Sequence, residues 1–281
     1  MVAMELEDEF GDIIAKARIG SGLSASQLAD QAGLSERDIQ DIESYRLTPD
    51  SDAIHALAVA LGLDARKLAA IAGGWTPPPL DPTNEAFRLT SIRVPYGPYA
   101  ENAYILGCQH TNLAAVVDPG GAIDEITRAL AEQGLRLHCV LVTHGHADHI
   151  GGLRMLVKKT QHEITVVSSR FDRNAVMAGV NASWVDPEDG GSFALGKLWI
   201  TVLLTPGHTS GSTCYAADEA CFVGDTLFAG SIGRPAGPSA YREMLDAIRS
   251  KLLTLPAETA LLPGHGPPTT VGEESQHNPF F

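Results

Sequence analysis

The chain has 281 residues and a formal net charge of −14 at pH 7, and 44% of its residues are hydrophobic. This length predicts one large domain or two domains with a sizeable core. The negative charge disfavours a general nucleic-acid-binding surface and an anionic membrane as partners. The sequence shows neither the basic and apolar start of a secretion signal nor an apolar run of the roughly 18–20 residues that cross a bilayer. We therefore expect a cytoplasmic protein with no membrane partner.

From about residue 5 to residue 73 every strong pattern is helical. In the stretch "GLSASQLADQAGLSERDIQDIE" (22–43), Ser24 and Ser35 are good N-caps, and Gly33 between them permits a tight turn. Two helices joined by such a turn make helix-turn-helix geometry. The segment resembles the Cro and phage-repressor type of helix-turn-helix domain, which implies a small all-α domain over residues 1–73.

The charge of this segment disfavours DNA as its partner. Residues 1–75 include thirteen acidic side chains and six basic ones, and the expected recognition helix at 35–46 holds four carboxylates against Arg37 and Arg46. Binding to DNA depends on cations that neutralise phosphates. DNA binding therefore stays open but disfavoured. The alternative is a role in protein contacts, including those of a homodimer.

The pattern changes after the helical segment. Residues 74–86, "GWTPPPLDPTNEA", hold four prolines, which predicts a stiff linker. From residue 87 to 281, short β-rich runs alternate with helical stretches and Gly/Pro loops. This alternation is typical of an α/β fold, so we expect a second domain over 87–281.

The run "THGHADHIGG" at residues 143–152 concentrates side chains that bind metals. It contains His144, His146, Asp148 and His149 directly after the apolar run "LHCVLV". We expect a strand to end at this point, and a single helix to open at Asp148 and to run on past the glycine pair. Nitrogen and oxygen ligands in this combination suit Zn²⁺.

Three further strand-like runs each end in a turn that carries one His or Asp. They place His208 in "TPGHTSGS", Asp225 in "CFVGDTLF" and His265 in "LLPGHGPP". Because strand ends in a layered α/β fold converge on one edge, we expect these side chains to meet the 143–152 run. The pattern HxHxDH followed by His, Asp and His resembles the metallo-β-lactamase fold hydrolases, with Asp118 as their usual early acidic residue.

This resemblance implies an αββα sandwich with two divalent metal ions at one edge. It assigns the ligands as follows: His144, His146 and His208 would hold the first ion, Asp148, His149 and His265 the second, and Asp225 would bridge both. Zinc is the expected metal, and iron and manganese are the alternatives.

The C-terminal segment indicates the type of hydrolase. The stretches "GSIGR" (230–234) and "LLPGHGPPTTVGEESQHNPFF" (261–281) resemble the short glyoxalase II, or hydroxyacylglutathione hydrolase, type. The resemblance implies hydrolysis of an S-acyl thioester such as S-D-lactoylglutathione by a metal-bound hydroxide, with Asp148 as both ligand and catalytic residue that orients the nucleophile. Arg234 is the candidate for holding a substrate carboxylate, and a structural salt bridge is its alternative role.

Other functions stay in competition with this one. The short type commonly has an acidic residue after Arg234, where this sequence has "PAGP", so the thiol carrier is left open. A mononuclear iron persulfide dioxygenase shares the fold and most of the ligand positions. A transcriptional regulator with a metabolite-sensing metal domain would explain the helix-turn-helix segment. A nucleic-acid phosphodiesterase is disfavoured because no basic, aromatic-rich patch supports it.

Overall fold

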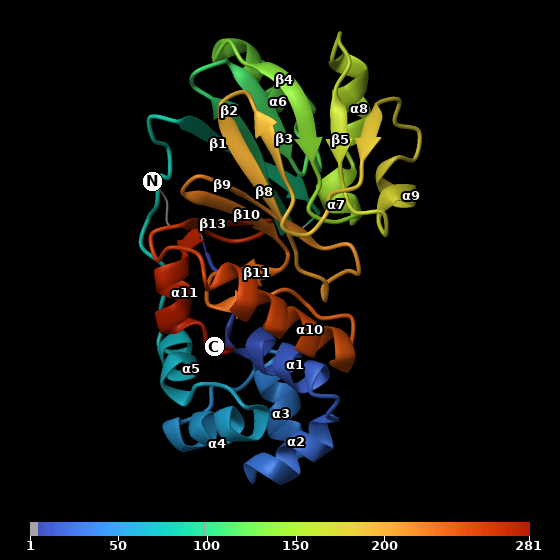
Figure 1. Cartoon of the computed structure of the whole chain (residues 1–281). Helices are drawn as coiled ribbons and strands as arrows, with labels where there is room; N and C mark the ends of the chain where they lie inside the picture. The colour runs from blue at the N-terminus through green and yellow to red at the C-terminus, as the bar shows by residue number, and fades with distance from the viewer. Residues whose placement is uncertain (1–4, 98) are drawn as a thin grey trace.

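N-terminal helices and two β-sheets make up the chain in Figure 1, a computed structural model that describes residues 5–97 and 99–281. The N-terminal helices are α1 (Phe10–Gly20), α2 (Ala25–Ala32), α3 (Glu36–Glu43), α4 (Ser51–Leu61) and α5 (Ala65–Ala72). Their apolar faces enclose buried residues such as Ile13, Leu28, Ile39, Leu57 and Leu68. None of the helices in the described part of the chain is long and apolar enough to cross a membrane.

The turn between α2 and α3 has the expected chemistry. The Ser24 hydroxyl accepts a hydrogen bond from the backbone N–H of Gln27 (3.1 Å), and the Ser35 hydroxyl accepts one from the N–H of Asp38 (3.1 Å). Gly33 ends α2 in the left-handed region at φ 68°, which residues with a side chain rarely adopt. The predicted helix-turn-helix geometry is therefore confirmed.

The first sheet combines antiparallel and parallel pairing. Its strand order is β1-β2-β3-β4-β5-β6, antiparallel from β1 to β3 and parallel from β3 to β6. The strands are β1 (Phe87–Tyr96), β2 (Tyr99–Cys108), β3 (Leu113–Val117), β4 (Arg136–Leu141), β5 (Thr165–Val167) and β6 (Ser183–Val185). The connections between the parallel strands hold α6 (Ile123–Glu132), α7 (Ala147–Ile150), α8 (Leu153–Lys159) and α9 (Arg173–Val176).

The second sheet is antiparallel except for one pair. Its strand order is β14-β13-β10-β9-β8-β7, and β10 pairs with β13 in parallel. The strands are β7 (Ser192–Leu195), β8 (Leu198–Leu204), β9 (Thr213–Ala217), β10 (Ala220–Gly224), β13 (Ala260–Pro263) and β14 (Thr269–Thr270). A short hairpin, β11 (Leu227–Phe228) and β12 (Ser231–Ile232), follows β10. The remaining helices are α10 (Pro238–Ala247), which continues into a π-helical turn (Ile248–Leu252), and α11 (Val271–His277).

The two sheets pack face to face around a shared apolar core. Side chains from both sheets, among them Phe87, Tyr104, Leu106, Tyr215 and Phe222, are buried between them. Removal of this apolar surface from water is the main force that holds the sheets together. Because helices cover the outer face of each sheet, the predicted αββα sandwich is confirmed (Figure 1).

The N-terminal helices pack on the outer helical layer of the second sheet, where α1 contacts α10 and α5 contacts α11 (Figure 1). A single apolar core runs through this contact and contains Ile14 and Ile71 from the N-terminal helices together with Met244 from α10. The N–H of Asp64 also donates to the carbonyl of Pro279 (2.8 Å). The helix-turn-helix segment is therefore packed into the molecule as a layer of its own.

The helix expected to open at Asp148 is interrupted. Gly151 and Gly152 separate α7 from α8. The N–H of Gly152 donates to the carbonyl of Pro119 (2.9 Å), and a Cβ on Gly152 would lie 2.7 Å from that same oxygen. The expectation of one continuous helix was wrong because the loop after β3 takes the space and the hydrogen bond that a continued helix would need.

The C-terminal tail is fastened through the buried carboxylate of Glu274. This carboxylate accepts hydrogen bonds from the N–H of Gly230 (3.0 Å), the hydroxyl of Thr269 (2.7 Å) and the side-chain amide of Asn278 (2.8 Å). Burial raises the pKa of Glu274 to about 7, although these donors act in the opposite direction. The motif "GEESQHN" therefore ties the tail to the start of the "GSIGR" stretch.

The substitution Glu274→Gln is expected to flatten the pH dependence of stability. Because the pKa of Glu274 is about 7 in the folded protein and 4.5 for an ordinary glutamate, the folded state holds an extra proton between these values. The free energy of unfolding of the wild type should therefore fall by up to about 3 kcal/mol as the pH rises through this window, and the variant should lose this part of the slope. Urea unfolding on both sides of the window measures it, with the exposed Glu258→Gln as control. Equal slopes in all three proteins would contradict the assignment.

Candidate functional site

The predicted metal ligands reach one edge of the sandwich from both sheets. β4 leads into the loop and short helix of the 143–152 run, and β8, β10 and β13 lead into turns that each carry one further ligand candidate. The structure brings together every predicted ligand: His144, His146, Asp148, His149, His208, Asp225 and His265. The sequence rule of one His or Asp after each strand therefore identified side chains that meet in space.

Three imidazoles form the first group. Nε2 of His144 lies 3.1 Å from Nδ1 of His146, and Nε2 of His208 lies 3.0 Å from the same Nδ1. A single N–H on His146 Nδ1 can form a hydrogen bond in only one of these two pairs. The other pair then brings two nitrogen atoms together without a hydrogen bond between them. A cation that accepts all three lone pairs fits this arrangement.

The second group is formed by Asp148, His149 and His265. Oδ2 of Asp148 lies 3.4 Å from Nε2 of His265 and 3.9 Å from Nε2 of His149. Asp225 lies between the two groups, with Oδ1 3.4 Å from Nε2 of His149 and Oδ2 3.6 Å from Nε2 of His208. The carboxylate of Asp225 therefore faces both groups at once.

The outward nitrogens of these histidines have fixed partners. Nδ1 of His208 donates to the carbonyl of Arg234 (2.9 Å), and Nδ1 of His265 donates to the carbonyl of Ala100 (2.9 Å). Since a carbonyl only accepts, the proton of each neutral ring sits on Nδ1. The lone pair of Nε2 then points inward, as metal-binding histidines require.

Asp118 lies behind His149 and orients its ring. Its Oδ2 lies 2.9 Å from Nδ1 of His149, and its two oxygens also accept hydrogen bonds from the N–H (2.7 Å) and the hydroxyl (2.5 Å) of Thr143. Asp118, His144 and His149 are close enough to form a third potential metal group. Because the Asp118 oxygens are already used by these donors, a supporting role fits Asp118 better than a ligand role.

The charges of the site suit a cation. Burial lowers the pKa of His144 well below its usual value, and burial likewise lowers the pKa of His208. The hydrogen bond from His265 holds the pKa of Asp148 at about 2. At neutral pH His144 and His208 are therefore neutral and Asp148 is ionised, which is the state that binds metals. Despite burial, the hydrogen bond with Asp148 raises the pKa of His265 to about 9, and the charge of Asp225 raises the pKa of His149, so a cation that binds at His265 displaces a proton.

Two buried atoms at the centre have no hydrogen-bond partner among the described residues: Nε2 of His149 and Oδ1 of Asp225. A buried polar atom without a partner costs roughly 1–3 kcal/mol. These two atoms lie 3.4 Å apart and belong to the side chains that join the two groups. A bound cation would satisfy both, so the residues present fit divalent metal ions.

Two glycines allow the chain to approach Asp225 closely. A Cβ on Gly264 would lie 2.5 Å from Oδ1 of Asp225, and a Cβ on Gly233 would lie 1.6 Å from the carbonyl oxygen of Asp225. Neither position can accept a larger residue without moving the centre of the site. This explains Gly264 in "PGHG" and Gly233 in "GSIGR".

A cavity of 410 Å³ opens beside the cluster. From the two-sheet part it is lined by Tyr96, Asp148, His208, Asp225, Phe228, Arg234 and His265, and from the N-terminal part by Glu7, Asp8, Asp12, Lys16 and Tyr45. In the described part of the chain, no carboxylate lies within ion-pair distance of the Arg234 guanidinium, so the structural salt bridge considered for Arg234 is not formed there.

Sequence reasoning missed two features of this site. The first is the contribution of N-terminal residues to the lining of the cavity. It follows from the packing of α1 against the two-sheet part, and no pattern in the sequence indicated it. The second is Glu101 in β2, a buried carboxylate whose oxygens have no hydrogen-bond partner among the described residues. Burial and the charges of Asp118, Asp225 and Asp148 raise the pKa of Glu101 to about 11, so at neutral pH the side chain is an uncharged acid.

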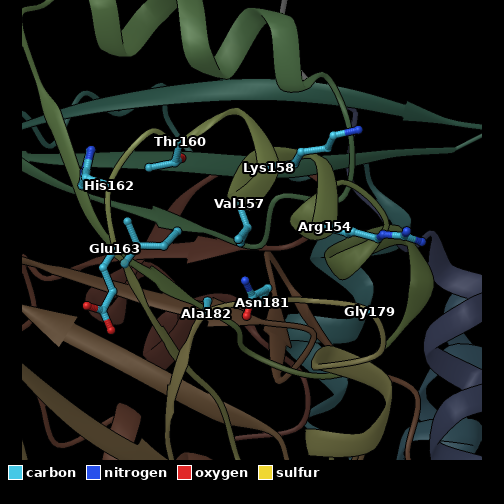
Figure 2. Close-up of a pocket in the computed structure, with 10 residues that line it drawn as sticks. Arg154, Val157, Lys158, Thr160, His162, Glu163, Gly179, Asn181 and Ala182 are labelled. Carbon is cyan, nitrogen blue, oxygen red and sulfur yellow. The ribbon is translucent and has the colours of Figure 1, made fainter.

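A separate cavity of 450 Å³ lies on the helical layer of the first sheet (Figure 2). Arg154 and Lys158 of α8 lie on one side of it, and His162 and Glu163 lie on the other. It shares no lining residue with the cluster. The chemistry of the 143–152 run therefore belongs to the 410 Å³ cavity.

Comparison with known families agrees with this geometry. Residues 96–265 match the model of the metallo-beta-lactamase superfamily, and residues 9–71 match a model of a helix-turn-helix domain. The chain is 37% identical over 206 residues to the probable metallo-hydrolase YqgX of Bacillus subtilis, covering 67% of this chain and 96% of that protein. It is 31% identical over 205 residues to the hydroxyacylglutathione hydrolase GloC of Haemophilus influenzae, again covering 67% and 96%.

Among solved structures, a crystal structure of TTHA1623 in a di-iron-bound form superimposes with a TM-score of 0.56 at 31% identity, covering 68% of this chain and 100% of that chain. The matched family model spans more than half of the present chain and includes the whole HxHxDH run, His208, Asp225 and His265. The chain therefore belongs to the metallo-beta-lactamase superfamily of metal-dependent hydrolases and carries a helix-turn-helix domain at its N-terminal side.

Proposed function

We propose that the protein hydrolyses S-acyl thioesters, of which S-D-lactoylglutathione is the first to test, at a site with two divalent metal ions. The observation that carries the proposal is the position of Asp225 between two groups of three ligands. The likeness to hydroxyacylglutathione hydrolase GloC supports the substrate class, and the likeness to a protein with a di-iron-bound form supports the two-ion site. Zinc remains the expected metal, with iron or manganese as alternatives.

The ligands divide between the two ions by their grouping. His144, His146 and His208 would hold the first ion, Asp148, His149 and His265 the second, and Asp225 would contact both. A carboxylate shared by two cations offsets their mutual repulsion, which is strong in a site as buried as this one. When bound, the two ions would supply an acidified water and a Lewis acid for the substrate carbonyl.

The side chains of this chain then position the reactants. Asp148 stays ionised because its pKa is about 2, so it can accept a hydrogen bond from the attacking water and orient it. Arg234 lines the cavity and would hold a carboxylate of the substrate. The water oxygen bonds to the carbonyl carbon and releases a proton to the solvent, and the C–S bond breaks. The sulfur leaves as a thiolate, which is stable enough to need no strong general acid.

Purified protein is expected to contain two divalent ions per chain and to hydrolyse S-D-lactoylglutathione. Elemental analysis followed by a spectrophotometric assay of thioester loss measures both. One iron per chain together with sulfite formation from a persulfide would replace this proposal with the dioxygenase alternative. Absence of hydrolysis with both sites filled would exclude this substrate.

The substitution His149→Ala is expected to reduce the metal content from two ions to one and to lower kcat by at least about 100-fold, because it removes a ligand of the second ion and leaves Asp225 Oδ1 without its neighbour. The matched control is His138→Ala on β4, where the side chain is exposed. Thermal unfolding of both variants checks that the fold is retained. Hydrolysis by His149→Ala at the wild-type rate would show that the reaction does not need the second ion.

DNA binding by the helix-turn-helix domain has little electrostatic support. On α3 and its flanks, Arg37 and Arg46 both pair with Asp41, at 3.5 and 2.7 Å, and Arg18 pairs with Glu43 at 2.5 Å. Guanidinium groups that already face carboxylates of their own domain contribute little to neutralising phosphates. We infer that this domain serves the hydrolase rather than a DNA site.

In a mobility-shift assay on genomic fragments at low salt, the protein is expected to give no retarded band. The physical reason is the excess of carboxylates around the expected recognition helix, which repels the phosphate backbone. A basic repressor of the same fold serves as positive control. A complex that weakens as salt rises would instead support the regulator alternative.

A further inference from the structure

The N-terminal domain forms one wall of the cavity that reaches the metal ligands. Glu7, Asp8, Asp12 and Lys16, from α1 and the segment before it, line this cavity together with Tyr45, which follows α3. On the opposite side the same cavity reaches Asp225, which is only 9% exposed and whose Oδ1 has no hydrogen-bond partner among the described residues. A substrate bound at the ligands would therefore touch the helix-turn-helix domain.

A buried lysine anchors this wall to the catalytic part. Nζ of Lys16 forms an ion pair with Asp8, donates to the carbonyl of Ile232 (2.8 Å) and lies 4.8 Å from the ring centroid of Phe228. Ile232 and Phe228 belong to the β11–β12 hairpin, which begins two residues after Asp225. Because Lys16 and Asp8 are both buried and satisfy one another, their contact holds α1 in place against the active-site hairpin.

Close packing at two further points makes the wall a fixed part of the site. A Cβ on Gly20 of α1 would lie 2.5 Å from the ring of Tyr241 of α10, so the two helices are in close contact there. A Cβ on Gly266, the residue after His265, would lie 3.0 Å from the backbone nitrogen of Glu7. The segment before α1 therefore runs directly alongside the loop that carries a metal ligand.

The charges on the wall are unequal. Lys16 and Asp8 form an ion pair, whereas the carboxylates of Glu7 and Asp12 have no ion-pair partner among the described residues. Burial raises the pKa of Glu7, and the nearby His265 and Lys16 act in the opposite direction. Arg234 lies on the other side of the cavity, where its carbonyl accepts the hydrogen bond of His208. A group of the substrate that extends toward the N-terminal domain therefore meets negative charge, and a second carboxylate at that position would be repelled.

We propose that the N-terminal helix-turn-helix domain is the substrate-selecting wall of this hydrolase, and that it favours thioesters whose thiol part carries a positive charge over uncharged ones, and uncharged ones over those whose thiol part carries only negative charge. The proposal rests on the thioester hydrolysis proposed above. In this proposal the acidic side chains of the domain serve substrate recognition, whereas they would oppose DNA binding.

Three thioacetates that differ only in the charge of the thiol part test this order. The cationic one is acetylthiocholine, whose quaternary ammonium group cannot accept the acyl group. The uncharged one is its 3,3-dimethylbutyl analogue, and the anionic one is 3-(acetylthio)propanoate. Release of thiol from each is followed with a chromogenic disulfide on metal-loaded, full-length protein. The expected kcat/KM falls on the order of tenfold from the cationic to the uncharged substrate, and again to the anionic one.

Glu7→Gln removes one negative charge from the wall without shortening the side chain. It is expected to reduce the preference for acetylthiocholine over the uncharged analogue several-fold, mainly through KM, and elemental analysis checks the metal content of the variant. The control is Glu36→Gln, the same substitution at an exposed position of α3 that does not line the cavity. That variant should keep the wild-type preference.

The outcomes separate the two proposals. If none of the thioacetates and no S-D-lactoylglutathione is hydrolysed by metal-loaded protein, thioester hydrolysis itself is wrong. If thioesters are hydrolysed but the three substrates react equally, or the anionic one reacts fastest, the selecting wall is overturned while the hydrolase activity stands. If Glu7→Gln and Glu36→Gln change the preference equally, the effect comes from net charge and the assignment to the wall is overturned.

Discussion

The structure depends on the convergence of imidazole nitrogens and carboxylates at one edge of the sandwich. Such a cluster is stable only if each ring is held in one tautomer, because donors and acceptors would otherwise clash at distances near 3 Å. Backbone carbonyls after β12 and in β2 hold His208 and His265, and Asp118 holds His149. In each neutral ring the remaining lone pair points inward, so the protein prepares the geometry of the site for cations before any cation binds.

Much of the surrounding fold can be understood as support for that edge. Glycines at 233 and 264 let two loops reach the Asp225 side chain and backbone. The buried carboxylate of Glu274 fastens the tail to the loop that leads from β11 toward Arg234. These contacts join residues that are close in space but far apart in the sequence. The site therefore forms only when the strands of both sheets have paired in their native register.

The N-terminal domain joins this arrangement through a continuous apolar core and through the buried Lys16–Asp8 pair. Within this domain Arg18 pairs with Glu43 and Arg46 pairs with Asp41, and the carboxylates of Glu7, Asp8 and Asp12 line the cavity. A helix-turn-helix fold does not by itself imply DNA binding, because phosphate recognition also needs free cations on the surface.

The sequence alone determined the alternation of strands and helices, the helix-turn-helix turn at Gly33 and the set of side chains that form the cluster. It could do so because strand ends, N-caps and closely spaced histidines are local patterns with a direct physical meaning. The αββα sandwich followed from the resemblance of the ligand pattern to the metallo-β-lactamase fold hydrolases. Only the tertiary structure decided the break between α7 and α8, the orphaned carboxylate of Glu101 and the entry of Glu7 and Lys16 into the cavity. Each of these depends on which distant backbone or helix packs against a residue, and no local pattern encodes that contact.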